Sequence, residues 1–236
     1  MNLKELEEEI SILVNDSRLS AFYKRWINEA VLAVADDLAL PALKLKNPET
    51  LEITEDAWTY TLPEQFQKQV FRVGAFNGTE LSAVNYVPIE KAKGGFEELE
   101  TLDPGHTFTA PHPEKYAVLS RTIGVFPKAA DTLYLWFYEK PTPLKDARDV
   151  PTCIPDSYHH RVIIPKLVIK NFRILQDMIV MAPHQSIAFW QTEYKNGLYG
   201  ERGGDMGLVN VIARENPPRR HGGRDPIWTG WGFQGS

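Results

Sequence analysis

A long stretch with helical periodicity, residues 157–180, constrains the fold more than any other part of this chain. Its apolar residues recur at three- and four-residue spacing, so they form one stripe that must be buried against other elements. Pro155 and Asp156 precede the stretch, and Asp156 or Ser157, its first residue, can cap the helix start. The stripe consists of Ile164, Val168, Phe172, Leu175 and Ile179.

A proline within this stretch and a second periodic run after it complete the motif. Pro165 has no N–H to donate to the carbonyl of Arg161, and we expect a kink there rather than a boundary because the stripe continues in phase. A second amphipathic run spans residues 184–199, and Pro183 suits the first turn of its helix. Residues 197–204 are rich in glycine and end it. The two runs predict an α-hairpin. The second stripe is Ile187, Trp190, Tyr194 and Leu198.

Two further helices are predicted before this motif. The first covers residues 3–14, and the second runs from about Leu19 to Leu40, where Pro41 stops it. Residues 15–18 between them form a turn with capping side chains. The second helix carries a wide apolar face that this pair alone cannot bury. We therefore expect both helices to pack on the α-hairpin.

Between Asn47 and Leu144 the period of the pattern falls from near four to near two, which predicts β-strands. Asn77-Gly78 supplies the two positive-φ positions of a type I′ hairpin turn. The last strand is rich in aromatic residues and should be central. We favour burial on both of its faces over a base-stacking platform. Residues 88–113 predict a long loop with one helical turn. Strands are expected over 51–54, 57–62, 70–76, 80–87, 116–120, 122–126 and 132–139.

The predicted fold class is α+β. It combines a mainly helical bundle, built from residues 1–46 and 150–204, with an inserted antiparallel β domain over residues 47–149 and an extended C-terminal tail over 205–236. Within the tail, residues 206–212 predict a short strand, and the remainder is too polar and too rich in proline and glycine to fold alone. Its basic and aromatic residues are candidates for docking on a partner. These candidates are Arg219, Arg220, Arg224, Trp228, Trp231 and Phe233.

Composition limits the classes of function. The net charge of −5 does not attract nucleic acid to the surface as a whole, although a local basic patch remains open. No uninterrupted apolar run approaches 18 residues, so a membrane-spanning helix is not expected. The first residues lack the basic start and apolar centre of a secretory signal. Cys153 is the single cysteine, which excludes an internal disulfide and suits a reducing compartment.

No motif predicts catalysis, metal binding or a cofactor. His159 and His160 are neighbours on a helix and point about 100° apart, so a solvated or capping role is expected rather than a shared metal. Cys153 should be a buried, inert thiol. Phosphate-binding loops and nucleophile elbows do not occur. The carboxylate pairs Asp36-Asp37 and Glu98-Glu100 match the residue types of a glycoside hydrolase, but such pairs are common on surfaces. We therefore expect that the protein is not an enzyme.

Three segments resemble the head–tail adaptor, or connector, proteins of tailed bacteriophages. They are Arg25-Trp26-Ile27-Asn28-Glu29-Ala30, the strand-to-proline segment 133–144, and the proline–acidic–Tyr–His helix start within 149–159. The order of helix pair, β insert, α-hairpin and tail is also similar to that family. The resemblance covers roughly residues 5 to 200, and the 88–113 segment does not align with it.

The resemblance implies a structural virion protein in the neck of the phage, present in the host cytoplasm during assembly. Such adaptors form a ring, usually of twelve copies, with a channel through which DNA passes transiently. The implied partners are the portal protein, on which the C-terminal tail docks, neighbouring subunits, and a distal tail or nozzle protein. No membrane and no cofactor are implied. Alternatives are another neck or tail-completion protein of a phage, or a small hydrolase acting on cell-wall carbohydrate.

Overall fold

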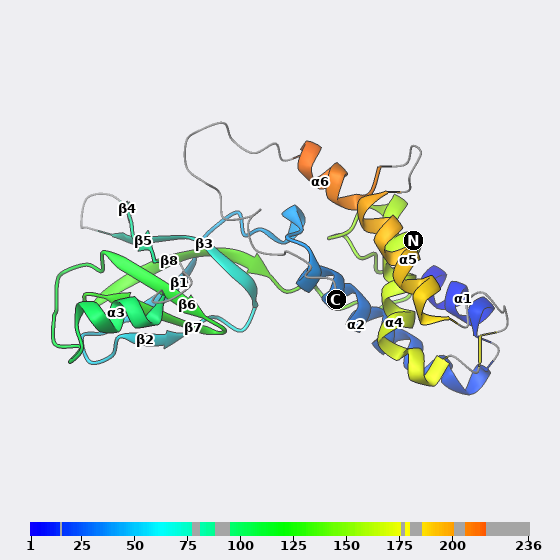
Figure 1. Ribbon diagram of the computed structural model, residues 1–236, viewed down its shortest axis with the longest axis horizontal. Coiled ribbons are helices and arrows are strands. Elements are labelled where there is room, and N and C mark those ends of the chain that lie inside the picture. The colour runs from blue at the N-terminus through cyan, green and yellow to red at the C-terminus, as the bar shows by residue number, and fades with distance from the viewer. Residues whose placement is uncertain are drawn as a thin grey trace. The chain divides into compact units, whose positions relative to one another are not determined.

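The protein is an α+β chain that divides into two compact units (Figure 1). The helical unit comprises Met1–Leu43 and Pro141–Ser236, and the β unit comprises Lys44–Lys140. The computed structural model describes residues 1–14, 16–76, 81–87, 95–175, 178–179, 186–200 and 206–215. No helix within those ranges combines the length and the hydropathy that a bilayer span requires. The predicted α+β class is confirmed.

The helical unit begins with the two predicted helices, α1 (Leu3–Leu13) and α2 (Ser20–Asp37). A capping box starts α1, because the Asn2 side chain accepts from the Glu5 N–H and the Glu5 carboxylate accepts from the Asn2 N–H. The α2 helix ends at Asp37, and Leu38 is already extended, so the predicted end at Leu40 is wrong. Pro41 instead starts a short 3₁₀ turn, Pro41–Leu43.

The long predicted helix changes its pitch near Pro165. A 3₁₀ turn (Asp156–Tyr158) leads into a π-helical turn (His159–Ile163) and then into α4 (Ile164–Leu175). Pro165 cannot take its place in the α-helical ladder, and the wider π turn directly before it accommodates this within one continuous helical path. At Pro165 the helix therefore changes its type without ending, and the kink inside α4 lies further along, at Asn171 (φ −107°, ψ 16°).

The far end of this helix differs from the prediction. The α4 helix stops at Leu175, not near residue 180, because Ile179 forms an antiparallel bridge with Val14 next to α1. The second helix of the pair, α5 (Ile187–Tyr199), packs against α4, while Pro183 and His184 lie outside the described residues. Both stripes are buried except that Phe172 is half-buried and Ile187 is 40% exposed.

The C-terminal helix α6 (Leu208–Glu215) corrects the prediction of a strand over residues 206–212. Leu208 is fully buried, and Val211 and Ile212 are half-buried, so the apolar residues fall at helical spacing. The α6 helix packs on α5. Gly207 makes this possible, since a Cβ there would overlap the backbone at Tyr199 and Gly200.

The β unit contains two four-stranded sheets. The first has the order β1-β8-β3-β4 and is antiparallel, and the second has the order β2-β7-β6-β5. The short β5 pairs with β6 in parallel, which departs from the predicted all-antiparallel arrangement. The strands are β1 (Glu49–Ile53), β2 (Thr59–Thr61), β3 (Phe66–Phe76), β4 (Leu81–Ala83), β5 (Asn85–Tyr86), β6 (Lys115–Leu119), β7 (Thr122–Phe126) and β8 (Asp131–Glu139).

The aromatic strand β8 is central, as predicted, since β1 and β3 flank it. Leu133, Leu135 and Phe137 are fully buried in the core of the unit. On the other face, Tyr134 and Trp136 are only half-buried, so the prediction of burial on both faces is wrong for them. The Arg72 guanidinium lies 4.5 Å from the centre of the Trp136 ring, which partly covers that aromatic surface.

The connections of the β unit differ in part from the prediction. The pairing of Phe76 with Leu81 is offset by two residues from the register that a two-residue turn at Asn77 and Gly78 gives, and that turn lies outside the described residues. The segment 88–113, predicted as a long loop with one helical turn, contains the seven-residue helix α3 (Phe96–Leu102). Glu97 and Glu98 occupy the first turn of α3, where negative charges interact favourably with the positive end of the helix dipole. Leu99 is buried.

Candidate functional site

Two of the three family-like segments meet in the helical unit through Asn28. The Asn28 side-chain amide donates to the carbonyls of Leu144 (3.1 Å) and Lys24 (3.0 Å), and its oxygen accepts from the Leu144 N–H (2.7 Å). Lys24 also donates to the Lys145 carbonyl. These bonds attach the chain to α2 at the point where it returns from the β unit to the helical unit. Asn28 therefore gives a physical link between two family-like segments that are distant in sequence.

The start of α1 is held by the same returning chain. The N–H groups of Leu3 and Lys4, which lack partners within the helix, donate to the carbonyls of Asp149 (2.8 Å) and Ala147 (3.1 Å). The Asp149 carboxylate accepts from the N–H groups of Asp146 and Lys145, and these bonds lower its pKa. Residues 144–149 therefore connect α1 and α2.

The two adjacent histidines have different environments. His159 is fully buried, with Nε2 2.7 Å from the Ile154 carbonyl oxygen and Nδ1 3.0 Å from the Met1 nitrogen. The predicted solvated or capping role is therefore wrong for His159, because its ring completes hydrogen bonds inside the core. His160 is exposed and lies 3.5 Å from the Glu9 carboxylate. No cluster of three or more metal-ligating side chains occurs among the residues that the structure places.

The remaining candidates for chemistry have structural roles. Burial raises the pKa of the Cys153 thiol to about 11, so it stays protonated at neutral pH, in line with the expected inert thiol. Asp37 accepts from Lys166 (2.6 Å) and from the Tyr194 hydroxyl (2.5 Å). Burial raises the pKa of Tyr194, and the Asp37 hydrogen bond raises it further. Asp37 thereby connects α2, α4 and α5 rather than serving one half of a catalytic carboxylate pair.

A surface groove of about 280 Å³ lies between α1, the π turn and α5. Apolar side chains line most of it, and Glu9 and Glu193 stand at its rim together with His160 and Arg161. Ile12 is the most exposed of its apolar residues, at 79%. The apolar lining consists of Ile12, Leu13, Ile164, Pro165, Phe189 and Trp190. The mostly apolar lining of this groove suits an apolar protein side chain.

Sequence reasoning did not find the groove, although Ile12 gave a signal. The buried stripe of α1 consists of Leu3, Leu6 and Ile10, and Ile12 falls off it on the solvent side. An isolated apolar residue in that position needs no explanation by itself. The predicted docking residues Arg219, Arg220, Arg224, Trp228, Trp231 and Phe233 lie outside the described residues, which end at 215.

Comparisons with known proteins assign the family. Among curated proteins, none matches the chain. The family model described as SU10 adaptor protein matches residues 1–217, which include the whole β unit and the helical unit through α6. This agrees with the resemblance to bacteriophage head–tail adaptors that the three segments carry. The chain therefore belongs to the SU10 adaptor protein family, a family of bacteriophage adaptor proteins.

Proposed function

We propose that the protein is the head–tail adaptor of a tailed bacteriophage and forms a ring of twelve copies between the portal and the tail. The observation that carries this proposal is the family match over residues 1–217. In this role the protein is a structural component of the virion neck, assembled in the host cytoplasm, and it has no catalytic function. The helical unit builds the ring, and the β unit contacts a distal tail or nozzle protein.

The charge of the chain fits a channel for DNA. A protein that neutralises phosphates with Lys and Arg binds DNA strongly, and a passage must not retain it. The net charge of −5 is in keeping with a channel wall that contacts DNA only transiently. No cofactor and no membrane enter into this role.

The C-terminal tail is the proposed docking element for the portal. Trp228, Trp231 and Phe233 supply aromatic anchors, each worth about 2–4 kcal/mol when buried as an interface hot spot. Arg219, Arg220 and Arg224 add charge-assisted hydrogen bonds to carboxylates of the portal. A ring of copies multiplies weak contacts through avidity, so the isolated protein is expected to be largely monomeric and to assemble on the portal.

Truncation tests this function directly. The full chain and a chain ended after Glu215, which retains α6, are each mixed with the portal protein of the same phage. Native mass spectrometry then gives the number of copies bound. We expect the full chain to form a portal complex and the truncated chain to fold without binding. Failure of the full chain to bind the portal would argue for another neck or tail-completion role, and unchanged binding of the truncated chain would exclude the tail as the docking element.

A further inference from the structure

We propose that the groove between α1 and α5 of one copy receives the Phe22 edge of a second copy, and that this contact joins neighbours in the ring. We define the Phe22 edge as Phe22 and Arg25 of α2 with Arg173 and Ile174 of α4. The inference rests on the proposed function, since it supplies the contact between subunits that a ring needs. It assigns residues to both sides of that contact.

The groove has the dimensions and the lining of a side-chain receptor. Its volume of about 280 Å³ leaves room for a protein side chain. Its walls are apolar or aromatic, and Ile12 stands at its edge with most of its surface in water. Covering that apolar surface is favourable at about 25 cal/mol per Å².

The Phe22 edge is an apolar projection with basic neighbours. Phe22 is 46% exposed and Ile174 is 48% exposed. Phe22 stacks on the buried Trp26 with ring centres 5.8 Å apart, so its ring is held in place before any contact forms. A rigid, half-exposed aromatic residue is the type of anchor that dominates interfaces, because little conformational entropy is lost when it binds.

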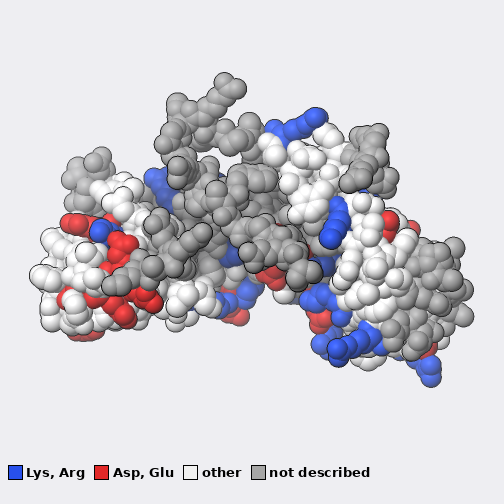
Figure 2. Space-filling model, viewed as in Figure 1, with Lys and Arg blue, Asp and Glu red and all other residues white. Residues whose placement is uncertain are grey.

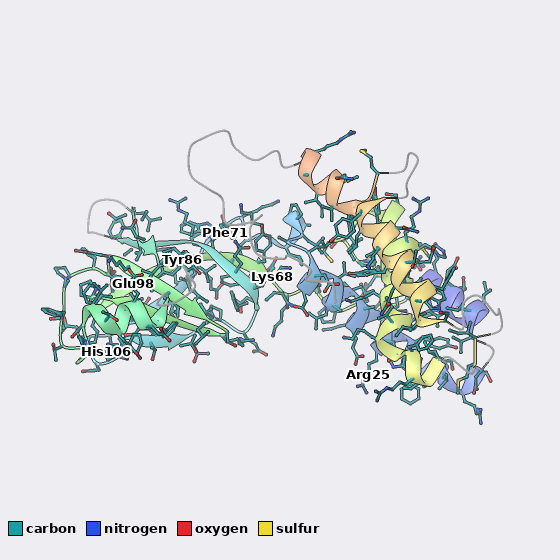
Figure 3. All side chains as sticks on the ribbon, in the orientation of Figure 1. Arg25, Lys68, Phe71, Tyr86, Glu98 and His106 are labelled. Atoms are coloured by element: carbon teal, nitrogen blue, oxygen red, sulfur yellow. The ribbon has the colours of Figure 1, made fainter. Side chains whose placement is uncertain are left out.

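Contacts between α2 and α4 place the four residues on one edge. Lys166 reaches Asp37, and Lys170 reaches the Glu29 carbonyl at 3.4 Å, so α4 runs antiparallel along α2. Arg173 and Ile174 follow in α4 toward the end of α2 that carries Phe22 and Arg25. Figure 2 shows Lys and Arg side chains over the part of the helical unit where Figure 1 places α2 and α4, and Figure 3 labels Arg25 there.

The two surfaces are complementary in charge. The groove carries Glu9 and Glu193 together with Arg161 and His160, and α1 adds further Glu side chains on its first turns. On the Phe22 edge, Arg25 and Arg173 are exposed and flank the apolar residues, and Arg25 also pairs with Glu29 of its own helix at 2.7 Å. Opposite charges around an apolar contact favour this pairing over the pairing of two grooves or of two Phe22 edges.

The arrangement of the surfaces is of the kind that a ring requires. The groove and the Phe22 edge are different parts of the same unit, so the contact between two copies is heterologous and leaves one groove and one edge unoccupied. Each added copy repeats this geometry until the rotation closes. A contact between like surfaces would instead stop at a dimer.

Cooperative binding to the portal is the experiment. Ile12→Asp places a charge in the groove and Phe22→Asp removes the anchor, and binding of each variant to the portal is measured by titration. Wild type should bind cooperatively, because each copy also contacts its neighbour. Both variants should lose this cooperativity, and their apparent affinity should fall by about 10- to 100-fold, equivalent to about 1.4–2.8 kcal/mol. Circular dichroism must show native helix content in both variants.

A matched control and a crosslink separate the possible failures. Leu119→Asp, at a residue of the β unit that is 56% exposed, should bind as wild type does. Glu193→Cys combined with Arg173→Cys should give covalent multimers with a short bis-maleimide on the portal, since the native Cys153 is buried. A wild type that does not bind the portal overturns the proposed function and this inference together. A wild type that binds, with Ile12→Asp and Phe22→Asp equally cooperative or with no crosslinked multimers, overturns the inference alone.

Discussion

A Cβ on residue 197, where the chain has glycine, would lie only 2.3 Å from the backbone carbonyl oxygen of Arg161 and would overlap it. Arg161 lies in the π turn before α4, and Gly197 lies inside α5. The contact between α5 and the chain before α4 thus combines two features. One is the wide π turn before Pro165, and the other is the glycine in α5. Glycine here permits helix packing rather than ending the helix, which continues to Tyr199.

Gly197→Ala should therefore destabilise the helical unit. The added methyl group gains about 1 kcal/mol of helix propensity but forces α5 away from α4, and overpacking of this kind costs about 1–3 kcal/mol. We expect a net loss of stability in urea unfolding followed by far-ultraviolet circular dichroism. Asn196→Ala, at the adjacent half-exposed position, should change stability by less than about 0.5 kcal/mol. Equal stabilities of Gly197→Ala and wild type would mean that the two helices separate without cost.

Asn28 should contribute more to stability than its exposed neighbours on α2. Asn28→Ala removes a hydrogen bond from each of the N–H and C=O groups of Leu144 and should cost about 2–3 kcal/mol. Asn28→Asp retains the acceptor for the Leu144 N–H and should cost less. Arg25→Ala breaks only an exposed ion pair with Glu29 and should cost about 0.5 kcal/mol or less. Thermal unfolding of these variants checks the order, and a smaller effect of Asn28→Ala than of Arg25→Ala would contradict it.

The sequence predicted which segments of the helical unit form helices better than it predicted where those helices end. Helices form where the helical periodicity of the sequence is strong. The apolar residues from Ile164 to Leu175, for example, face one side only when that segment is a helix, and they are then buried together. The end of α4 was missed because it depends on the bridge between Ile179 and Val14, residues far apart in sequence. The prediction of a strand over residues 206–212 was wrong because the spacing of the apolar residues was misread. Val211 and Ile212 lie three and four residues after Leu208, which is the spacing of a helix.

The candidate site could not be predicted, because it is a property of packing. The groove needs Ile12 of α1, Pro165 of α4 and Phe189 of α5 in one place, and no local pattern contains that relation. The burial of His159 has the same cause, since its partner Ile154 is local but its burial depends on α1 and Met1. Asn28 was noticed in sequence only through the family resemblance, and its bonds to Leu144 supply the physical reason.

Tyr194 should make the stability of the helical unit sensitive to alkaline pH. Its pKa is raised by burial first and by the hydrogen bond to Asp37 second. A raised pKa in the folded state means that its contribution is complete below the unfolded value, near 10, and is lost as the pH rises above it. Tyr194→Phe should cost about 1.5–3 kcal/mol at pH 7, as expected for a hydrogen bond to a charged group.

The measurement is urea unfolding of wild type and Tyr194→Phe between pH 7 and pH 11. We expect the two stabilities to converge as the pH rises above 10, because Tyr194 then loses its proton in unfolded wild type, whereas the folded state keeps the proton that Tyr194 donates to Asp37. The Tyr194→Phe variant has no such proton to lose. Tyr199→Phe, at a tyrosine of the same helix that is 55% exposed, is the control and should follow wild type. Parallel curves for wild type and Tyr194→Phe would show that the hydroxyl does not stabilise the folded state.

Asp103 should make the stability of the β unit sensitive to acidic pH, whereas Tyr194 makes the helical unit sensitive to alkaline pH. It is 3% exposed at the end of α3, and its carboxylate accepts from the Phe108 N–H (2.8 Å) and the Thr107 hydroxyl (3.3 Å). Burial raises the pKa of Asp103, but the hydrogen bonds from Phe108 and Thr107 and the nearby His106 together outweigh burial. The net pKa is therefore below its ordinary value, and the ionised form is the one that orders the turn after α3.

A lowered pKa in the folded state fixes the sign of the effect. The stabilising contribution of Asp103 is present above the unfolded value, near 3.9, and is lost as the pH falls through the lower folded value. Asp103→Asn keeps one acceptor oxygen but removes the charge, so the variant should be less stable than wild type at pH 7. The difference should shrink as the pH falls below about 4, because protonation then makes wild type resemble the variant. Glu100→Gln, at an exposed position of α3, should leave the pH profile unchanged. Urea unfolding between pH 3 and pH 7 decides the matter, and a difference between Asp103→Asn and wild type that stays constant over this range would show that the charge of Asp103 does not order the turn.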